Sequence, residues 1–577
     1  MPAAPIDKVI VTNKAVLKRK YGSQVSRINT ALQELVDADA QRGLNTIVVD
    51  LGSAAAMKKY KGTAVKATQA SDAAANKRAI DKVFKATRPA YLMLLGATDV
   101  IPHQPLKNPL YAINPQTGES DDPDQLVDSD LPYACDAAYS TDVRKFLNPT
   151  RVVGRLPDVT SAGDVAYLEG VLKTAAGYQQ RPVKEYDACF ALSTATWMGS
   201  TKKSLKSIFQ STAGLNVVPP KGPPWPDAAL KSRAQFINCH GNTATPSFTG
   251  EKVGPEPDFD KKYPTALSSS DLPRHVANGT VVAAECCYGA ELYDPQLAMG
   301  EIGICNAYLG EQAYGFFGSS TIAYGPTDGT DYADILCLEF LKEVRKGASV
   351  GRACLTARLK YLDKPGPFTP TDLKTFAQFA LLADPSVTPV QTAVSPHAVA
   401  ALPKWKPAAL TVGGAQAGQS AVLAMERLAR NSRRQSLLNW SNTAAALTAI
   451  SAETVVEAWQ APKAKVAAAA AKSPKSPLDL LRQWAAQMNL THPVLLSAKV
   501  PTAKAQAAAA PMSPAAKLAL ASAAAGPAES TLRPTTVHVV MERQLAEAAD
   551  QKVGLIVRGF EAIEYDGLVE VRQFQSR

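Results

Sequence analysis

The chain has 577 residues, a net charge of +10 and an ordinary fraction of hydrophobic residues. A chain of this length is too long for a single hydrophobic core, so we expect three or four structural units of about 100–200 residues each. It has no apolar run of about 18 residues, which excludes a membrane-spanning helix, and its first residues lack the apolar run of a signal peptide. These features predict a cytoplasmic protein without a membrane span.

Eight cysteines lie at positions 135, 189, 239, 286, 287, 305, 337 and 354. None of them has the C-x-x-C spacing of a zinc site or a redox motif, so no metal site is expected from them. Several fall within apolar runs, where cysteine packs as a small core residue. A reducing compartment is the simplest interpretation.

Most of the net positive charge comes from residues 396–577, which hold 20 Lys and Arg against 12 Asp and Glu. Such a region can bind nucleic acid or an acidic surface. Basic and aromatic residues do not alternate there, so nucleic acid is an unlikely partner. A solvated Ala/Lys-rich region is the simpler interpretation, and a regulatory protein partner for it stays open.

Residues 1–183 are predicted to form a non-catalytic α/β unit. Continuous apolar strands separated by helices are typical of a parallel sheet covered on both faces. The expected strands are Asn45–Asp50, Ala90–Gly96, Asp130–Tyr133 and Arg151–Leu156, and the expected helices are Val25–Ala40, a helix capped by Ser71 and Asp72 that runs to about Ala86, and Ser161–Tyr178.

Residues 184–395 are predicted to form a second α/β unit with a sheet of its own. The expected strands are Tyr186–Leu192, Ala234–Cys239, a strand from Val281 to Cys286, and Ala313–Gly318, and the expected helices are Lys202–Ser211, Ser270–His275, Tyr332–Arg345, Ser349–Tyr361 and Thr371–Leu382.

The remaining chain divides into two further segments. Residues 396–530 are rich in Ala, Pro and Lys, which predicts a helical or mobile linker. Residues 531–577 are predicted to form a small α+β unit, with strands at Thr535–Met541, Val553–Val557 and Leu568–Arg572 and a helix at Glu542–Gln551.

Two of the expected strands end in chemically reactive residues. One is followed by His240 and Gly241, and the other ends at Cys286 and Cys287. A thiol becomes a nucleophile only with a base or a positive charge beside it. Parallel strands place their carboxyl ends at one edge of a sheet, so this pair predicts a cysteine–histidine dyad. Taken alone, either side chain is more often a structural residue.

The pair resembles the caspase-like cysteine peptidases, in which one strand ends in His-Gly and a later one in a small residue followed by the nucleophilic cysteine. Four further stretches resemble the gingipain family in particular and occur in that family's order. They are Tyr91–Pro102, Ser129–Tyr133, Val152–Pro157 and Leu382–Ser386. The resemblance covers about residues 40–390 and implies two caspase-like subdomains, each a mostly parallel sheet between helices.

The resemblance also implies a mechanism. Cys287 attacks a peptide carbonyl, His240 protonates the leaving amine, and the backbone N–H groups of Gly241 and Cys287 hold the oxyanion. Cys287 fits the family pattern with Cys286 in the slot for a small residue and Glu285 before it. Cys286 stays open as the alternative nucleophile, because it gives the Cys-x-x-Gly spacing of some members.

The substrate is much less defined than the dyad. A carboxylate in the pocket for the residue before the cut bond (P1) would select arginine or lysine. Asp128, Asp130 and Asp136 lie in the matching stretch, with capping and turn roles as the alternative. Basic specificity would make Lys463, Lys465, Lys472 and Lys475 candidate self-cleavage points.

Two further questions stay open from the sequence. The acidic loop from Asp121 to Asp124 is a candidate calcium site, with a plain solvated loop as the alternative. The activity itself has two rivals. One is a caspase-like signalling scaffold without enzymatic activity, and the other is a thiol hydrolase or transpeptidase acting on a non-protein amide.

Overall fold

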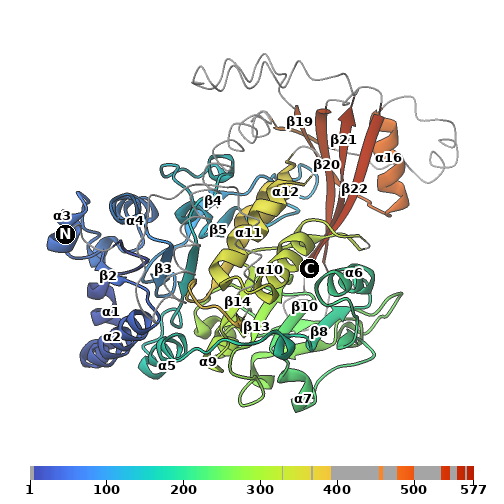
Figure 1. Ribbon diagram of the computed structural model, residues 1–577. Helices are drawn as coiled ribbons and strands as arrows, with labels where there is room; N and C mark the ends of the chain where they lie inside the picture. The colour runs from blue at the N-terminus through green and yellow to red at the C-terminus, as the bar shows by residue number, and fades with distance from the viewer. Residues whose placement is uncertain are drawn as a thin grey trace, which may run out of the picture.

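The computed structural model describes residues 5–327, 329–364, 368–391, 454–458, 477–499, 534–545, 555–565 and 568–577. It has the predicted α/β class, with one large, mostly parallel sheet between helices and a separate antiparallel sheet built largely from the C-terminal strands (Figure 1). None of the helices within these ranges is long and apolar enough to cross a membrane.

The large sheet has ten strands. Their spatial order is β2 (Thr46–Asp50), β1 (Lys8–Thr12), β3 (Tyr91–Leu95), β6 (Val153–Leu156), β16 (Phe379–Leu382), β14 (Gly315–Ser319), β13 (Val281–Ala284), β10 (Ala234–Asn238), β8 (Cys189–Thr194) and β9 (Leu215–Val218). Most neighbouring pairs are parallel, as the continuous apolar runs predicted.

The expectation of two separate sheets is wrong, because β16 joins the two halves into one. It pairs with β6 at Leu382 and Arg155 and runs antiparallel to β14. These residues were predicted as the end of a helix. Instead, helix α12 (Pro370–Gln378) ends at Gln378, and the fully buried run Phe379–Leu382 continues as a strand. A short apolar run fits either structure by periodicity alone, and sheet pairing decides it here.

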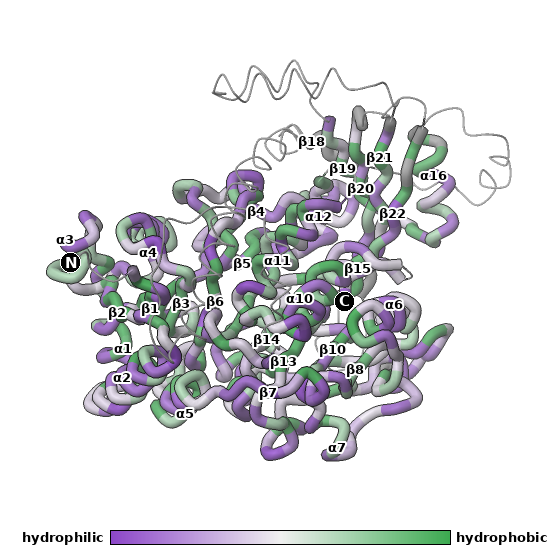
Figure 2. The backbone as a smooth tube through the Cα atoms, in the orientation of Figure 1, coloured by the Kyte–Doolittle hydropathy of each residue, from purple (hydrophilic) through white to green (hydrophobic). Residues whose placement is uncertain are grey.

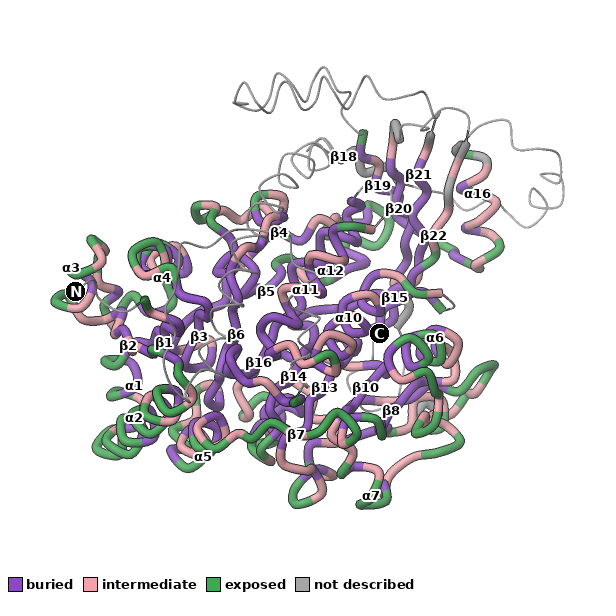
Figure 3. Tube along the Cα trace, in the orientation of Figure 1, coloured by how far each residue is buried: buried purple, intermediate pink, exposed green. Residues whose placement is uncertain are grey.

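Helices cover both faces of the sheet. Along β13, the side chains of Val281 and Ala283 join one core cluster, whereas Val282 and Ala284 join another. The first cluster includes α6 (Met198–Phe209), α10 (Ala333–Arg345) and α11 (Val350–Leu362), and the second includes α1 (Lys14–Tyr21), α2 (Val25–Gln41), α4 (Ala73–Thr87), α5 (Val165–Ala176) and α9 (Ile304–Gly310). The central strands are accordingly apolar (Figure 2) and buried (Figure 3).

Shorter elements complete this part of the chain. They are α3 (Ala54–Lys59), β4 (Gln104–Lys107), β5 (Leu126–Ser129), β7 (Arg181–Pro182), α7 (Asp227–Leu230), β11 (Ser247–Thr249), α8 (Phe259–Lys262), β12 (Thr265–Ser268) and β17 (Val390–Gln391). Two predicted elements differ in kind. The strand expected at 130–133 is a 3-10 turn over Leu131–Ala134, with Pro132 in its first turn, and the helix expected at 270–275 is a 3-10 turn over Ser269–Asp271.

The second sheet has six strands, and one of them comes from residues 184–395, the half of the chain that the sequence predicts to be catalytic. Its order is β15 (Tyr324–Gly325), β22 (Leu568–Ser576), β21 (Leu555–Tyr565), β20 (Pro534–Leu545), β19 (Val494–Lys499) and β18 (Thr454–Ala458), with α16 (Pro477–Gln487) packed on it. The helix predicted from Glu542 is wrong at its start, because β20 continues to Leu545 against β21. The predicted linker therefore contains β18, α16 and β19.

Candidate active site

His240 and Cys287 follow the ends of two neighbouring strands, β10 and β13. In the β10–β13 pair, Ala234 is opposite Val281 and Ile237 is opposite Ala284, a constant offset of 47 residues. The N–H of Glu285 donates to the carbonyl of Ile237 at 2.8 Å, so the pairing continues past the strand ends. The same offset places His240 opposite Cys287 at the carboxyl edge of the sheet.

Gly241 contacts Cys287 directly. A Cβ added at Gly241 would lie 2.0 Å from the carbonyl oxygen of Cys287, far inside van der Waals contact. Only glycine permits this approach of the two backbones. The His-Gly motif therefore brings the segment after β10 against Cys287.

His240 is oriented by a carboxylate and two rings. Its Nε2 lies 3.2 Å from Oε2 of Glu251, which also accepts from the hydroxyl of Thr196 at 2.7 Å. The indole of Trp197 and the phenol ring of Tyr263 meet the imidazole edge-on, at centroid distances of 4.5 and 5.6 Å. Burial alone would raise the pKa of Glu251, but its contacts with His240, Thr196 and Lys262 lower it to about 2. Glu251 is thus an anionic partner for His240 that the sequence did not single out.

The two adjacent cysteines point to opposite faces of the sheet. Cys286 belongs to the core cluster of α9, with its sulfur 3.9 Å from the carbonyl of Ile237. Cys287 belongs to the cluster of α10 on the other face, and its sulfur lies 3.3 Å from the backbone nitrogen of Ala323. Alternation along an extended segment separates the pair in this way and places Glu285 on the face of Cys287.

The last residue of the sequence, Arg577, occupies the face of Cys287. The backbone N–H of Cys287 donates to the carbonyl oxygen of Arg577 at 2.7 Å, and the N–H of Arg577 donates to the carbonyl of Ala323 at 2.9 Å. In Figure 1 the C-terminus lies beside α10, near the end of β10. The main-chain oxygen of Arg577 is therefore held at the backbone of the predicted nucleophile.

The side chain of Arg577 fills a buried acidic pocket. Its guanidinium is bound by Asp334 through both nitrogens, at 2.9 Å to Oδ1 and 3.1 Å to Oδ2, and by the carboxylate of Glu285. The carbonyl of Pro326 accepts at 3.1 Å, and Trp197 faces the guanidinium at 5.3 Å. The guanidinium, Glu285 and Asp334 are each 0% exposed. This pocket is built for a long, planar cation.

Glycine makes room for that cation. A Cβ added at Gly325 would lie 2.0 Å from Nε and from Nη2 of Arg577. Burial and the neighbouring Asp334 raise the pKa of Glu285 well above its usual range, although Arg577 opposes both effects. Two buried carboxylates in one pocket thus need a cation beside them.

The aspartates weighed for the P1 pocket lie elsewhere. Asp130 binds the guanidinium of Arg155 and the Nδ1 of His103, and Asp136 binds Arg151. Asp128 is exposed, on β5. Burial opposes the charge of Asp130, yet Arg155 and His103 hold its pKa well below the usual range. It is a structural ion pair within the N-terminal half.

Replacing Asp130 is therefore a test of stability. Asp130→Asn leaves the buried Arg155 with one charge partner fewer, and we expect the free energy of unfolding to fall by about 3–5 kcal/mol. The matched control is Asp128→Asn, two residues away and exposed, which is expected to stay within about 0.5 kcal/mol. Urea unfolding followed by circular dichroism measures both, and equal stabilities of the two variants would contradict the buried-pair assignment.

Aspartates of the candidate calcium loop form hydrogen bonds with side chains of the protein. Asp122 accepts from Lys374 and from the hydroxyl of Tyr324, and Asp124 accepts from Lys374 and from the hydroxyl of Tyr288. Within the described part of the chain, no group of three His, Cys, Asp or Glu side chains is arranged to hold a metal ion. Lys463, Lys465, Lys472 and Lys475 lie outside the described residues.

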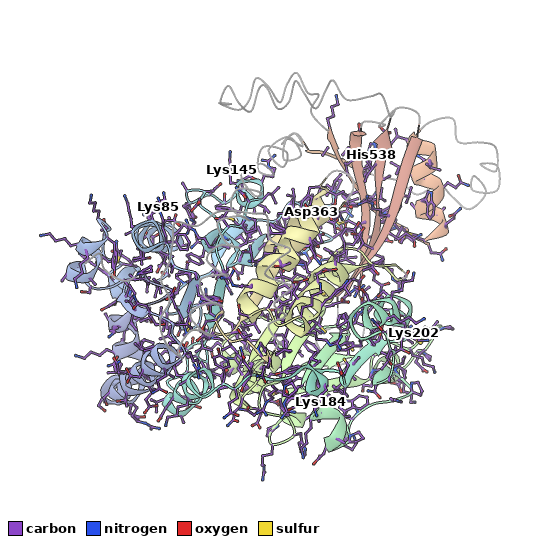
Figure 4. All side chains as sticks on the ribbon, in the orientation of Figure 1. Lys85, Lys145, Lys184, Lys202, Asp363 and His538 are labelled. Atoms are coloured by element: carbon purple, nitrogen blue, oxygen red, sulfur yellow. The ribbon has the colours of Figure 1, made fainter. Side chains whose placement is uncertain are left out.

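The other histidines lie away from this edge of the sheet. His538, labelled in Figure 4, is on β20 of the second sheet, where it contacts Ser497 and Glu564. His103 contacts Asp130, and His275 contacts Asp227. Among the described histidines, only His240 follows a strand that adjoins the cysteine strand.

Residues 2–187 match the family model of Peptidase family C25. The resemblance to the gingipain family is thereby confirmed, and the match supports a cysteine-type peptidase. It ends before β8, so the strands that carry His240 and Cys287 lie beyond it. A solved structure described as "Structure of Protease" is similar over 67% of this chain and 79% of its own, with 16% identity and a TM-score of 0.39. Among curated proteins, none matches the sequence.

Proposed function

We propose that this C25-type chain is a cysteine endopeptidase that cuts peptide bonds after arginine. The observation that carries the proposal is the position of Arg577. Its carbonyl oxygen accepts from the N–H of Cys287 while its guanidinium is bound by Asp334 and Glu285. A substrate arginine bound in the same way presents its carbonyl carbon to the Cys287 thiol.

Each catalytic group has a defined part in the reaction. The thiol of Cys287 passes its proton to His240 and its sulfur attacks the carbonyl carbon. The N–H of Cys287, joined by that of Gly241, stabilises the oxyanion. The C–N bond then breaks as His240 returns the proton to the amine, and water hydrolyses the thioester to release the acid and the thiol. The hydrogen bond to Glu251 uses Nε2, so we assign the proton transfer to Nδ1 of His240.

Arginine fits the pocket better than lysine does. The guanidinium donates from Nη2 to Asp334 and from Nη1 to Glu285, and a single ammonium group does not reproduce this pair of separated donors. The stacking of Trp197 over the guanidinium adds a second contact specific to a planar cation. The eight free cysteines support a reducing location such as the cytoplasm.

A panel of fluorogenic peptides that differ only at P1 tests the proposal. The Arg577→Ala form of the chain is incubated with peptides carrying arginine, lysine, aspartate or alanine at P1. We expect the arginine peptide to be cut about tenfold or more faster than the lysine peptide, which is about 1.4 kcal/mol of discrimination. Faster cleavage after aspartate would overturn the arginine specificity. No cleavage of any peptide would overturn the proposal and favour the thiol hydrolase or the scaffold.

Glu251 is expected to act as a positioning residue for His240. We expect Glu251→Gln to lower kcat about 10- to 100-fold with little change in KM, because the imidazole loses its orienting anion but the pocket is intact. Glu251→Asp is expected to restore part of kcat. The matched control is Glu256→Gln on the same loop, where Glu256 pairs with Lys252 at the surface. A rise in KM with unchanged kcat would contradict this role.

A further inference from the structure

The C-terminal strand binds the catalytic half as an added strand. β22 runs antiparallel to β15, with Ser576 opposite Tyr324 and Gln575 opposite Gly325. The ladder continues through Arg577, whose N–H donates to the carbonyl of Ala323 and whose main-chain oxygen accepts from the N–H of Cys287. Addition of an extended segment to an exposed strand edge is a general mode of peptide recognition. Residues 568–577 thus lie where the acyl side of a substrate is expected to bind.

This segment leaves no space for a substrate. The guanidinium of Arg577 fills the acidic pocket so closely that a single added carbon at Gly325 would overlap it. Cys287 is 4% exposed and His240 is 8% exposed with the segment in place. Burial raises the pKa of the Cys287 thiol to about 12, so the nucleophile is protonated in this arrangement.

Further contacts hold the C-terminal sheet against the catalytic half. The ring of Phe574 packs edge-on against Tyr324 and Tyr332, at centroid distances of 5.1 and 6.4 Å. On the adjacent strand β21, the buried carboxylate of Glu561 accepts from the hydroxyl of Tyr332 at 2.8 Å and from the N–H of Thr371 at 3.2 Å. The position of β22 is therefore fixed by its sheet as well as by Arg577.

A more distant contact adds to this docking. The backbone N–H of Arg543, on β20, donates to Asp121 of the N-terminal half at 3.2 Å. The amide of Asn114 donates to the carbonyl of His492, next to β19, at 3.2 Å. The C-terminal sheet thus contacts both the N-terminal half and the half that contains Cys287. The strand that enters the site, β22, belongs to this sheet and is held in place with it.

We propose that residues 568–577 are an intramolecular competitive inhibitor, which keeps the peptidase latent until β22 leaves β15. This proposal rests on the proposed function, which assigns the pocket to a substrate arginine. It adds that residues 568–577 occupy the pocket and thereby inhibit the peptidase. A tethered segment acts at an effective concentration in the millimolar range, so it outcompetes dilute substrates even with modest intrinsic affinity. The basic C-terminal region then regulates the active site of the same chain, not that of a separate protein.

Alkylation of Cys287 tests the occupancy without relying on catalysis. The 577-residue chain, its Arg577→Ala form and its Gln573→Ala form are treated with iodoacetamide, and each cysteine is quantified by peptide mapping. Gln573 is the matched control, because it lies on the same strand with an exposed side chain. We expect Cys287 to react at least about tenfold faster in Arg577→Ala than in the other two proteins, because the pocket anchor that buries it is lost.

Two internal checks make the result decisive. The core thiols Cys239 and Cys354 are expected to react equally slowly in all three proteins, which shows that Arg577→Ala is folded; if it is not, Arg577→Lys replaces it and is expected to give an intermediate rate. Equal alkylation of Cys287 in the folded variant and the full chain would overturn the inference, whether or not either protein cuts peptides.

Peptide cleavage separates the inference from the proposed function. We expect Arg577→Ala to cut the arginine peptide at least about tenfold faster than the full chain, and a synthetic peptide of residues 569–577 to inhibit it competitively. The same peptide with alanine in place of Arg577 is the control and is expected not to inhibit. Equal cleavage by both proteins would overturn latency alone. Absence of cleavage from both, with faster alkylation in the variant, would overturn the proposed function and leave the occupancy supported.

Discussion

Cys287→Ala is expected to abolish peptide cleavage, with a loss of at least about 10³-fold in kcat, because the acyl-enzyme route needs its sulfur. Cys286→Ala is expected to keep activity within a few-fold. The structure gives the reason for this difference. The Cys287 backbone binds the Arg577 carbonyl, whereas the sulfur of Cys286 lies in the core on the opposite face. Both variants are compared in the Arg577→Ala background, so that latency does not mask the effect.

The Cys286 variant also serves as the control for the fold. Removing its buried sulfur leaves a small cavity, with an expected cost of about 1 kcal/mol in unfolding free energy, so its protein is expected to stay folded. A protein that loses activity with Cys286→Ala and keeps it with Cys287→Ala would reverse the assignment of the nucleophile.

Asp334→Asn is expected to lower kcat/KM for the arginine peptide by about 10²- to 10⁴-fold. Removing one partner of a buried ion pair costs about 3–5 kcal/mol, which corresponds to roughly this factor. Glu339→Gln is the matched control, because Glu339 lies on the same helix but pairs with Lys360 outside the pocket. The panel of P1 peptides, again in the Arg577→Ala background, measures both variants.

Gly325→Ala tests the same pocket by shape instead of charge. The added methyl group occupies the position of the guanidinium, so we expect cleavage after arginine to fall as far as in Asp334→Asn. In the same Arg577→Ala background, the reactivity of Cys287 toward iodoacetamide is expected to stay high, because this small reagent does not use the pocket. Unchanged cleavage after arginine in both pocket variants would show that this pocket does not read P1.

The pairing of the strands that precede His240 and Cys287 could be predicted from the sequence for a simple geometric reason. His240 and Cys287 each follow an apolar strand, and neighbouring parallel strands keep a constant offset, here 47 residues, up to and beyond their ends. The helix cap at Asp72 was equally local and holds as predicted, since its side chain accepts from the backbone N–H of Ala75, three residues later. Local patterns of this kind need no knowledge of distant contacts.

The pocket was not predictable, because its parts come from four distant segments. Glu285 follows β13, Gly325 lies in a two-residue strand, Asp334 begins a helix, and Arg577 ends the sequence. Asp334 carried only the ordinary signal of an acidic residue in a first helical turn. Three aspartates nearer to the family motifs drew attention instead, and one of them proved to be the ion partner of Arg155.

The errors at β16 and β20 have a related cause. The run Phe379–Leu382 is apolar throughout, so periodicity did not distinguish a strand from the end of α12. In β20, the strand pattern stops at Glu542, a polar residue in a buried position. Its carboxylate accepts from Thr491 and from the N–H of His492 next to β19, and this long-range partner lets the strand continue.

An arginine-directed acyloxymethyl ketone tests the central claim most directly. This probe needs an arginine pocket and a nucleophilic thiol at the same site, because the sulfur displaces the carboxylate leaving group and forms a stable thioether. With the Arg577→Ala chain, we predict a single adduct that peptide mapping places on Cys287 and that Asp334→Asn suppresses. An adduct on Cys286, or equal labelling by a probe that carries aspartate at P1, would contradict the account.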